Sequence, residues 1–168
     1  VSKHTPQTPP RPLSTEERLA RGENFLSAHR NPKVIETLQD IPTQIQGEKK
    51  CRWYFALGMA HRKLHHYSKA QEHLQEAMRT CRDKDLIRRA AYVHAKVISI
   101  RSGLKAIEPI EEFAKNFKGH TMVDDVLFWA GDLYQRRELY TDANRYFERA
   151  QNLKKKGDYC AESLWRMA

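Results

Sequence analysis

At 168 residues, with 40% hydrophobic and 30% charged residues, the chain is long enough for one domain with a core or for a short array of repeats. It has no run of about 18 apolar residues, which excludes an ordinary membrane-spanning helix, and no signal-peptide hydrophobic region. Because it begins with Val, we expect a processed protein or a fragment.

The formal net charge is +9, and most of the excess lies in the middle of the chain. Lys and Arg outnumber Asp and Glu by 7 to 3 in residues 51–84 and by 7 to 4 in residues 85–120. Such a distribution favours an anionic partner, whether nucleic acid, an acidic peptide or a carboxylate-rich polymer. A solvated basic surface without a dedicated partner is the alternative.

The first thirteen residues, which include "VSKHTPQTPPRP", offer almost no apolar side chain to bury and lose backbone donors to proline. We therefore expect residues 1–13 to form a disordered, Pro-rich arm. A helix is predicted to begin directly after it, because Ser14 and Glu17 have the spacing of a capping box. Asn31 and Pro32 resemble an N-cap followed by proline at the first helical position.

No sustained strand alternation is present, and helical signals continue to the end of the chain. We expect four helix pairs, at residues 15–29 with 32–41, 50–65 with 68–82, 85–102 with 105–117, and 122–138 with 141–154. Pro42, Gly103 and Gly119 fall where helices should stop. The predicted fold class is all-α, over residues 14–168.

One register repeats along these pairs with a period of 36–37 residues. Gly22, Gly58, His94, Gly131 and Ala168 recur at spacings of 36, 36, 37 and 37. A small residue at this position lets the two helices of a pair cross closely, and larger apolar residues follow on the buried face of the second helix. One pair cannot bury its own apolar side, so neighbouring pairs must stack into an α-solenoid. The residues predicted to pack are Gly22, Val34, Leu38, Tyr54, Leu57, Gly58, Ala70, Leu74, Ala77, Ala106, Ile110, Leu127, Gly131, Tyr134, Ala143, Phe147 and Ala150.

Two of these units resemble a tetratricopeptide repeat. The residues that carry the resemblance are Tyr54, Leu57, Gly58, Ala70, Leu74 and Ala77 in the second unit, and Leu127, Ala130, Gly131, Tyr134, Ala143, Phe147 and Ala150 in the fourth. The array departs from that family in its longer period, in lacking a proline near the end of each unit, and in His94 and Arg21, which break the pattern. We describe it as tetratricopeptide-like.

A narrower resemblance lies in residues 120–168, where an Asp-Asp helix start, an apolar and aromatic helix, a Tyr/Asp/Ala helix and "GDYCAESLWRMA" follow in order. This stretch, like residues 13–38, resembles the superhelical region that precedes the catalytic domain of soluble lytic murein transglycosylases. The resemblance implies a periplasmic, non-catalytic scaffold that positions a C-terminal catalytic domain on peptidoglycan. In that family the catalytic glutamate lies in a Glu-Ser motif followed by Gly-Leu-Met-Gln, and the second segment is absent here.

The Glu162-Ser163 pair therefore needs a separate explanation. It aligns one period after Asp125 and Val126, at the start of a first helix, and neither an enclosed site nor a second carboxylate accompanies it. We predict a helix-start carboxylate and no catalytic residue in this chain. The chain is expected to end within the first helix of a fifth unit, with Ala168 at its crossing position and Trp165 packed on the fourth unit or on a neighbouring molecule.

The histidines and cysteines show no established metal-binding spacing. His61 and His65 are one turn apart and should face the same way, but a third ligand is missing and His61 lies at a packing position, so no metal is predicted. Cys51 should begin a first helix and Cys81 should end its antiparallel partner, so a disulfide is geometrically possible, although two buried thiols are the preferred interpretation. Cys160 is left over in either case.

No cofactor is predicted. The spacing of the aromatic residues is typical of core packing rather than of stacking on bases or sugars, and the chain contains no nucleic-acid recognition module, so nucleic acid is not an expected partner. The expected partners are peptidoglycan or the chain's own C-terminal catalytic domain, in the periplasm. The alternative is an adaptor, periplasmic or cytoplasmic, that binds a partner protein or peptide in a concave groove.

Overall fold

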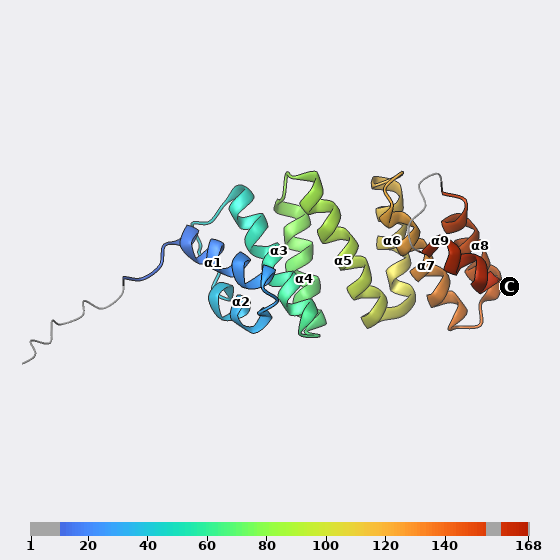
Figure 1. Cartoon of the computed structure of the whole chain (residues 1–168), viewed down its shortest axis with the longest axis horizontal. Coiled ribbons are helices and arrows are strands. Elements are labelled where there is room, and N and C mark those ends of the chain that lie inside the picture. The colour runs from blue at the N-terminus through green and yellow to red at the C-terminus, as the bar shows by residue number, and fades with distance from the viewer. Residues whose placement is uncertain (1–10, 154–158, 168) are drawn as a thin grey trace, which may run out of the picture.

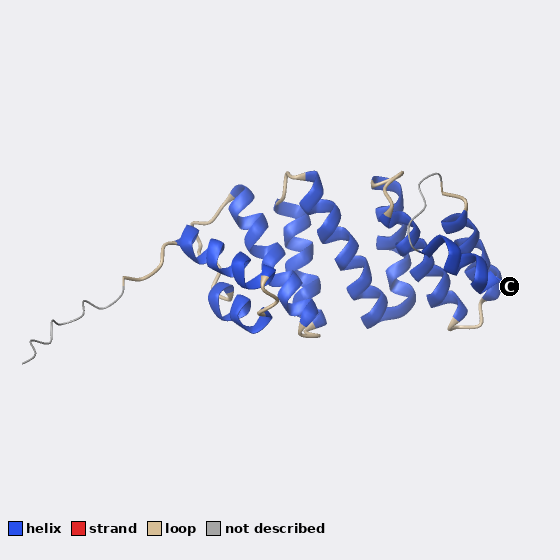
Figure 2. Ribbon diagram, viewed as in Figure 1, coloured by secondary structure: helices blue, strands red, loops and turns tan. Residues whose placement is uncertain are grey.

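The computed structural model describes residues 11–153 and 159–167, and the elements within them are helices joined by short loops (Figures 1 and 2). The helices lie one after another along an elongated stack, from α1 at one end to α9 at the other. Their bounds are α1 Thr15–Ser27, α2 Asn31–Leu38, α3 Gly47–Lys63, α4 Tyr67–Thr80, α5 Lys84–Ser102, the 3-10 helix η1 Gly103–Ala106, α6 Ile107–Asn116, α7 Met122–Gln135, α8 Tyr140–Gln151 and α9 Tyr159–Met167.

Consecutive helices pair as predicted, α1 with α2, α3 with α4, α5 with α6 and α7 with α8, and each pair stacks on the next. The helix α9 follows α8 and packs on α7 and α8. The prediction of an all-α, tetratricopeptide-like solenoid is therefore confirmed. Of the arm predicted at residues 1–13, residues 1–10 lie outside the described part, and Arg11 pairs with Glu17 of α1 at 2.5 Å.

The start of α1 follows the sequence signal, whereas the start of α2 does not. Ser14 accepts a hydrogen bond from the backbone N–H of Glu17 at 3.2 Å, and the Glu17 carboxylate accepts one from the backbone N–H of Ser14 at 2.8 Å. Asn31, expected at the N-cap of α2, is its first helical residue, and the cap position belongs to Arg30. The Asn31 amide donates backwards to the His29 carbonyl at 3.3 Å, so that N-cap prediction is wrong by one residue.

The turn inside a helix pair is built by a residue in the left-handed backbone region. His29, His65 and Glu138 have φ values of 56°, 60° and 58°. In each case the following N–H bonds the carbonyl five residues earlier, which closes the helix end in a Schellman-type motif. The third unit differs: α5 ends at Ser102, Gly103 follows with φ 57°, and η1 precedes α6 where a single helix was predicted from residue 105.

The predicted crossing glycines lie where two helices touch. A Cβ on Gly58 would lie 2.7 Å from Leu74 Cγ, and one on Gly22 would lie 2.5 Å from Leu38 Cδ1, so no other side chain fits without displacing the partner. The structure buries the predicted packing residues, with Tyr54 and Tyr134 partly exposed. Ala168, the fifth predicted crossing residue, lies outside the described residues.

In the third unit the crossing position holds His94, and the two helices are less closely packed than in its neighbours. A hollow of about 700 Å³ lies here, lined by α4, α5, η1 and α6. Burial lowers the pKa of His94, whose Nε2 has no hydrogen-bond partner among the described residues. The irregular third unit thus coincides with the one crossing position that lacks a small residue.

Candidate functional site

The side chains of Glu162 and Ser163 both form hydrogen bonds within α9. Glu162 accepts a hydrogen bond from Arg166 Nε at 3.2 Å, and the buried Ser163 hydroxyl donates to the Tyr159 carbonyl at 2.8 Å. Trp165 is 71% exposed, so it does not pack on the fourth unit, and of the two expected contacts only the one with a neighbouring molecule stays a prediction. Contact with the fourth unit comes instead from Tyr159, whose ring stacks on Phe128 with 4.6 Å between the ring centres.

The first helices of successive units touch one another along one face, which we call the first-helix face (α1, α3, α5 and α7). Here Arg52 binds Glu23 with two hydrogen bonds of 2.7 and 2.5 Å. Further along, Tyr92 donates to Asp125 at 2.6 Å, and the ammonium group of Lys96 lies 4.2 Å from the centre of the Trp129 ring. These polar contacts join unit to unit, so they stabilise the stack.

A hollow of about 530 Å³ opens on this face between α1, α3 and α5. Its carboxylates are already engaged. Asp83 accepts backbone N–H groups at the start of α5, and Glu48 accepts the backbone N–H of Arg82 at 3.3 Å. The lining arginines are engaged too, since Arg89 lies over the ring of Phe55 at 5.0 Å. We therefore regard this hollow as part of the stacking interface.

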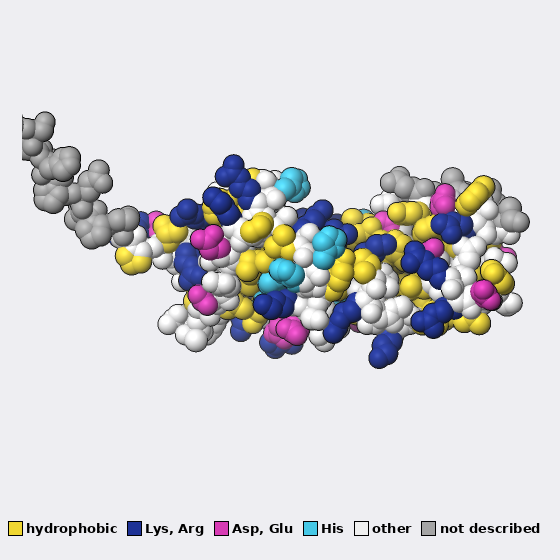
Figure 3. All heavy atoms as spheres, turned by 90° about the horizontal axis from the view of Figure 1, so that it is seen from below, with side chains coloured by type: hydrophobic (Ala, Val, Ile, Leu, Met, Phe, Trp, Pro, Cys, Tyr) yellow, Lys and Arg dark blue, Asp and Glu magenta, His cyan; other side chains and the backbone are white. Residues whose placement is uncertain are grey.

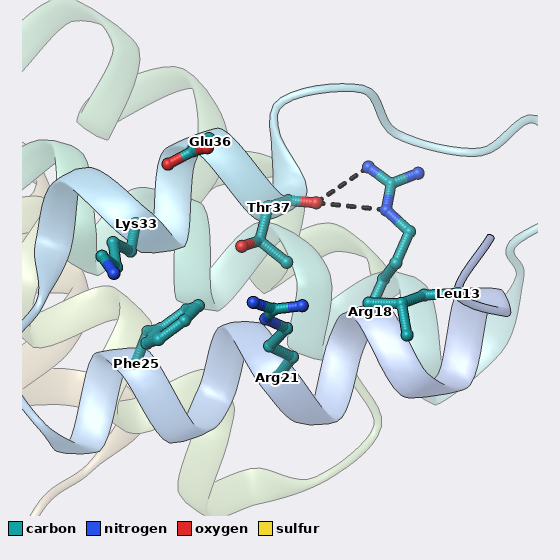
Figure 4. Close-up of a pocket in the computed structure, with 7 residues that line it drawn as sticks. All are labelled: Leu13, Arg18, Arg21, Phe25, Lys33, Glu36 and Thr37. Atoms are coloured by element: carbon teal, nitrogen blue, oxygen red, sulfur yellow. Dashed lines mark hydrogen bonds between the residues drawn. The ribbon is translucent and has the colours of Figure 1, made fainter. Parts of the chain in front are cut away.

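A second hollow, of about 390 Å³, lies between α1 and α2 (Figure 4). Arg18 reaches across it and donates to the Thr37 carbonyl at 2.8 and 3.2 Å, near the end of α2. Arg21 and Lys33 lie against the Phe25 ring, at 5.5 and 5.6 Å from its centre. Its cations therefore hold the two helices together, and little apolar surface is left for a ligand.

A third hollow lies between α6 and α8, over the start of α7, and we call it the α6–α8 groove. Its volume is about 480 Å³. Its floor is apolar, and its rim carries four cations and two carboxylates. The lining residues are Glu111, Ala114, Lys115, Lys118, Gly119, Val123, Leu127, Arg145, Glu148, Arg149, Asn152 and Leu153.

One wall of the α6–α8 groove is fixed by a three-residue cluster. Arg149 of α8 binds Glu111 of α6 with two hydrogen bonds of 2.5 and 2.8 Å, and Tyr146 donates to the same carboxylate at 2.6 Å. The Arg149 hydrogen bonds lower the pKa of Glu111, while burial and the bond to Glu111 raise the pKa of Tyr146 to about 12. The carboxylate therefore stays charged and the phenol neutral at pH 7, so the wall is rigid.

The other cations of the rim have fewer hydrogen-bond and ion-pair partners. Lys115 and Lys118 are exposed, and neither has a carboxylate partner within the part of the chain that the structure describes. Arg145 pairs with Asp142 at 3.1 Å. An apolar floor with unpaired lysines at its edge suits an anionic, amphipathic ligand.

The histidines meet in a combination different from the expected one. His65 turns toward the Tyr67 hydroxyl, at 2.6 Å, because its left-handed backbone directs it away from α3. His61 lies against His66, with 3.3 Å between the two Nδ1 atoms, and its ring centre is 5.2 Å from that of His73. The expectation that His61 and His65 face the same way is therefore wrong.

The structure brings Cys51 and Cys81 together. Their sulfur atoms are 1.92 Å apart, with 4.8 Å between the Cα atoms, which is the geometry of a disulfide. The bond joins the first turn of α3 to the end of α4, as the antiparallel arrangement allows. The side chain of Cys160 lies outside those that the structure describes.

None of the helices in the described ranges is long and apolar enough to cross a lipid bilayer. No protein-family model matches the sequence, and no curated protein matches it.

Two crystal structures of MamA are similar in fold. One has a TM-score of 0.68 at 22% identity, over 82% of this chain and 71% of that one. The other has a TM-score of 0.68 at 21% identity, over 91% of this chain and 80% of that one. At this level of identity the likeness shows the tetratricopeptide-like fold and leaves function to be argued from the chain's own surface.

Proposed function

We propose that this chain is a non-catalytic helical-repeat scaffold, and that its α6–α8 groove binds an acidic, amphipathic segment of a partner protein. The observation that carries the proposal is the groove itself, in which Leu127 and Val123 form part of an apolar floor and Lys115 and Lys118 lie unpaired at the rim. Stacked helix pairs offer extended surfaces for such segments. The net charge of +9 favours the approach of an acidic partner.

The hollows differ in whether their polar groups are free to bind a ligand. Arginines and carboxylates on the first-helix face bind one another across units, and the cations between α1 and α2 lie over Phe25 or hold the Thr37 carbonyl. Among the described residues of the α6–α8 groove, Glu111 and Arg149 bind each other and Arg145 pairs with Asp142, whereas Lys115 and Lys118 have no carboxylate partner. A ligand there would gain ion pairs without breaking existing ones.

The test uses a fluorescein-labelled peptide with Leu at positions i, i+3, i+4 and i+7 and Glu elsewhere, followed by fluorescence anisotropy. We expect saturable binding that weakens as salt is added. The double variant Lys115→Glu/Lys118→Glu should weaken it about tenfold, because each exposed ion pair contributes up to about 1 kcal/mol.

The matched control is Lys63→Glu/Lys69→Glu, which makes the same change in net charge on two exposed lysines outside the groove. This control should bind the peptide nearly as well as the unmodified chain does. Equal weakening by both double variants would mean that net charge alone attracts the peptide. Absence of binding at low salt would also refute the proposal.

The second candidate is a periplasmic scaffold that positions a lytic transglycosylase catalytic domain on peptidoglycan. The resemblance of residues 13–38 and 120–168 to that family supports it, as do the cations of the groove, since murein stem peptides carry carboxylates. Purified murein fragments, added as a competitor in the anisotropy experiment, separate the two. Displacement of the labelled peptide from the unmodified chain would favour murein, and retention of the peptide would favour a protein partner.

A further inference from the structure

Histidine side chains gather at the surface over α3 and α4 (Figure 3). Three histidines belong to the turn between these helices and to the helix segments beside it. His61 lies in the last turn of α3, His66 immediately precedes α4, and His73 lies in the second turn of α4. His61 is 4% exposed, whereas His66 is exposed to solvent. His61 is therefore buried between the helices, whereas His66 is accessible from solvent.

The pair His61 and His66 has the spacing of two ligands on one ion. Their Nδ1 atoms are 3.3 Å apart. Two imidazole nitrogens bound to a tetrahedral Zn²⁺ at about 2.0–2.1 Å are separated by about 3.3 Å. Without an ion, one shared hydrogen occupies the space between the nitrogens; a metal ion would take its place.

His61 also stays in the form that binds metals. Burial, together with the nearby His73, Lys69 and His66, lowers the pKa of His61 to about 4. The imidazole is therefore neutral at pH 7, with a lone pair available on the unprotonated nitrogen. The positive charge of Lys69 disfavours a cation at this position, so the ion must be one that imidazole binds strongly.

His73 has the tautomer of a third ligand. Its Nδ1–H donates to the Lys69 carbonyl at 2.6 Å, so in the neutral ring the lone pair is on Nε2. Metal-binding histidines are commonly fixed in this way by a backbone carbonyl on the other ring nitrogen. As the described side chains stand, the three rings do not place three nitrogens within 4.8 Å of one another. A site of three ligands therefore requires the His73 side chain, whose ring centre is 5.2 Å from that of His61, to shift toward His61 while it keeps its bond to the Lys69 carbonyl.

We propose that His61, His66 and His73 bind one divalent transition-metal ion of the kind that prefers imidazole, with Zn²⁺ as the representative ion. The ion would link the end of α3 to the start of α4. The Cys51–Cys81 bond links the opposite ends of the same two helices. An ion that binds the folded chain and not the unfolded chain would raise the melting temperature.

The experiment titrates Zn²⁺ into chelator-treated protein at pH 7.5, by calorimetry and by thermal unfolding. Every protein carries Cys160→Ser, which removes the thiol outside the disulfide. The expected result is one ion per chain and a higher melting temperature with Zn²⁺. His66→Ala and His73→Ala should each weaken binding roughly tenfold or more. His66 makes no side-chain capping bond, so its variant should fold.

The matched control is His65→Asn, which removes a neighbouring exposed histidine at a backbone position that asparagine tolerates. It should bind Zn²⁺ like the parent protein. The proposal is overturned if the parent shows no saturable binding of one ion, if His66→Ala binds as tightly as the parent, or if His65→Asn weakens binding as much as His66→Ala does.

Discussion

At the scale of single residues, the molecule depends on three glycines that let helices cross. Gly22, Gly58 and Gly131 each face a large side chain of the following helix, and a Cβ added to Gly131 would lie 2.6 Å from Phe147 Cδ1. Real Cβ atoms essentially never approach this closely, so the Phe147 ring would have to move. Because that ring is fully buried, the surrounding core would move with it.

We predict that Gly131→Ala destabilises the chain by about 1–2 kcal/mol. Overpacking a core costs about 1–3 kcal/mol, and the better helix propensity of alanine returns up to about 1 kcal/mol. Urea unfolding gives the value. The double variant Gly131→Ala/Phe147→Leu should cost less than the sum of the two single changes, because the smaller side chain makes room. Additive costs would show that the two residues do not compete for space.

Unlike the crossing glycines, the residues that close the turns could not be predicted from their residue type. His29, His65 and Glu138 occupy left-handed backbone positions that favour glycine, and no glycine marks them in the sequence. They follow the repeat period, at spacings of 36 and 73 residues, so their only signal is their place in the register. The same turn directs His65 away from His61, which no spacing rule on a continuous helix could have indicated.

At the scale of elements, regular units were predictable and the irregular one was only partly so. The apolar register placed the four helix pairs because burial on a helix repeats with the helical period. His94 marked the third unit as unusual, but the sequence did not show that η1 would precede α6 or that a hollow would open beside His94. Those features depend on how α5 and α6 settle when a large side chain separates them.

The Cys51–Cys81 bond provides a test of the second pair. We predict that oxidised protein, denatured without reductant, shows one reactive thiol per chain, and that reduction reveals all three. Cys51→Ser/Cys81→Ser should lower the free energy of unfolding by about 3–4 kcal/mol, because the bond closes a loop of 30 residues in the unfolded chain. Three reactive thiols before reduction would contradict the bond.

At the scale of the whole molecule, charge and architecture were readable from the sequence, whereas the site was not. Lys115 and Lys118 look like any other lysines of the basic middle region. Their significance comes from the hollow that opens between α6 and α8, and from Glu111 being bound by Arg149 and Tyr146. Basic side chains also spread along the face in Figure 3, so composition alone could not select one groove.

The central claim is that an acidic segment binds in the α6–α8 groove. The most direct measurement is an amide chemical-shift titration of ¹⁵N-labelled protein with the Leu/Glu peptide. We predict that the largest shifts fall in α6, the start of α7 and α8, around Lys115, Leu127 and Arg149. The variant Lys115→Glu/Lys118→Glu should need about ten times more peptide to reach the same shifts. Shifts concentrated instead on α1, α3 and α5, or spread evenly over the basic surface, would contradict the α6–α8 groove as the binding site.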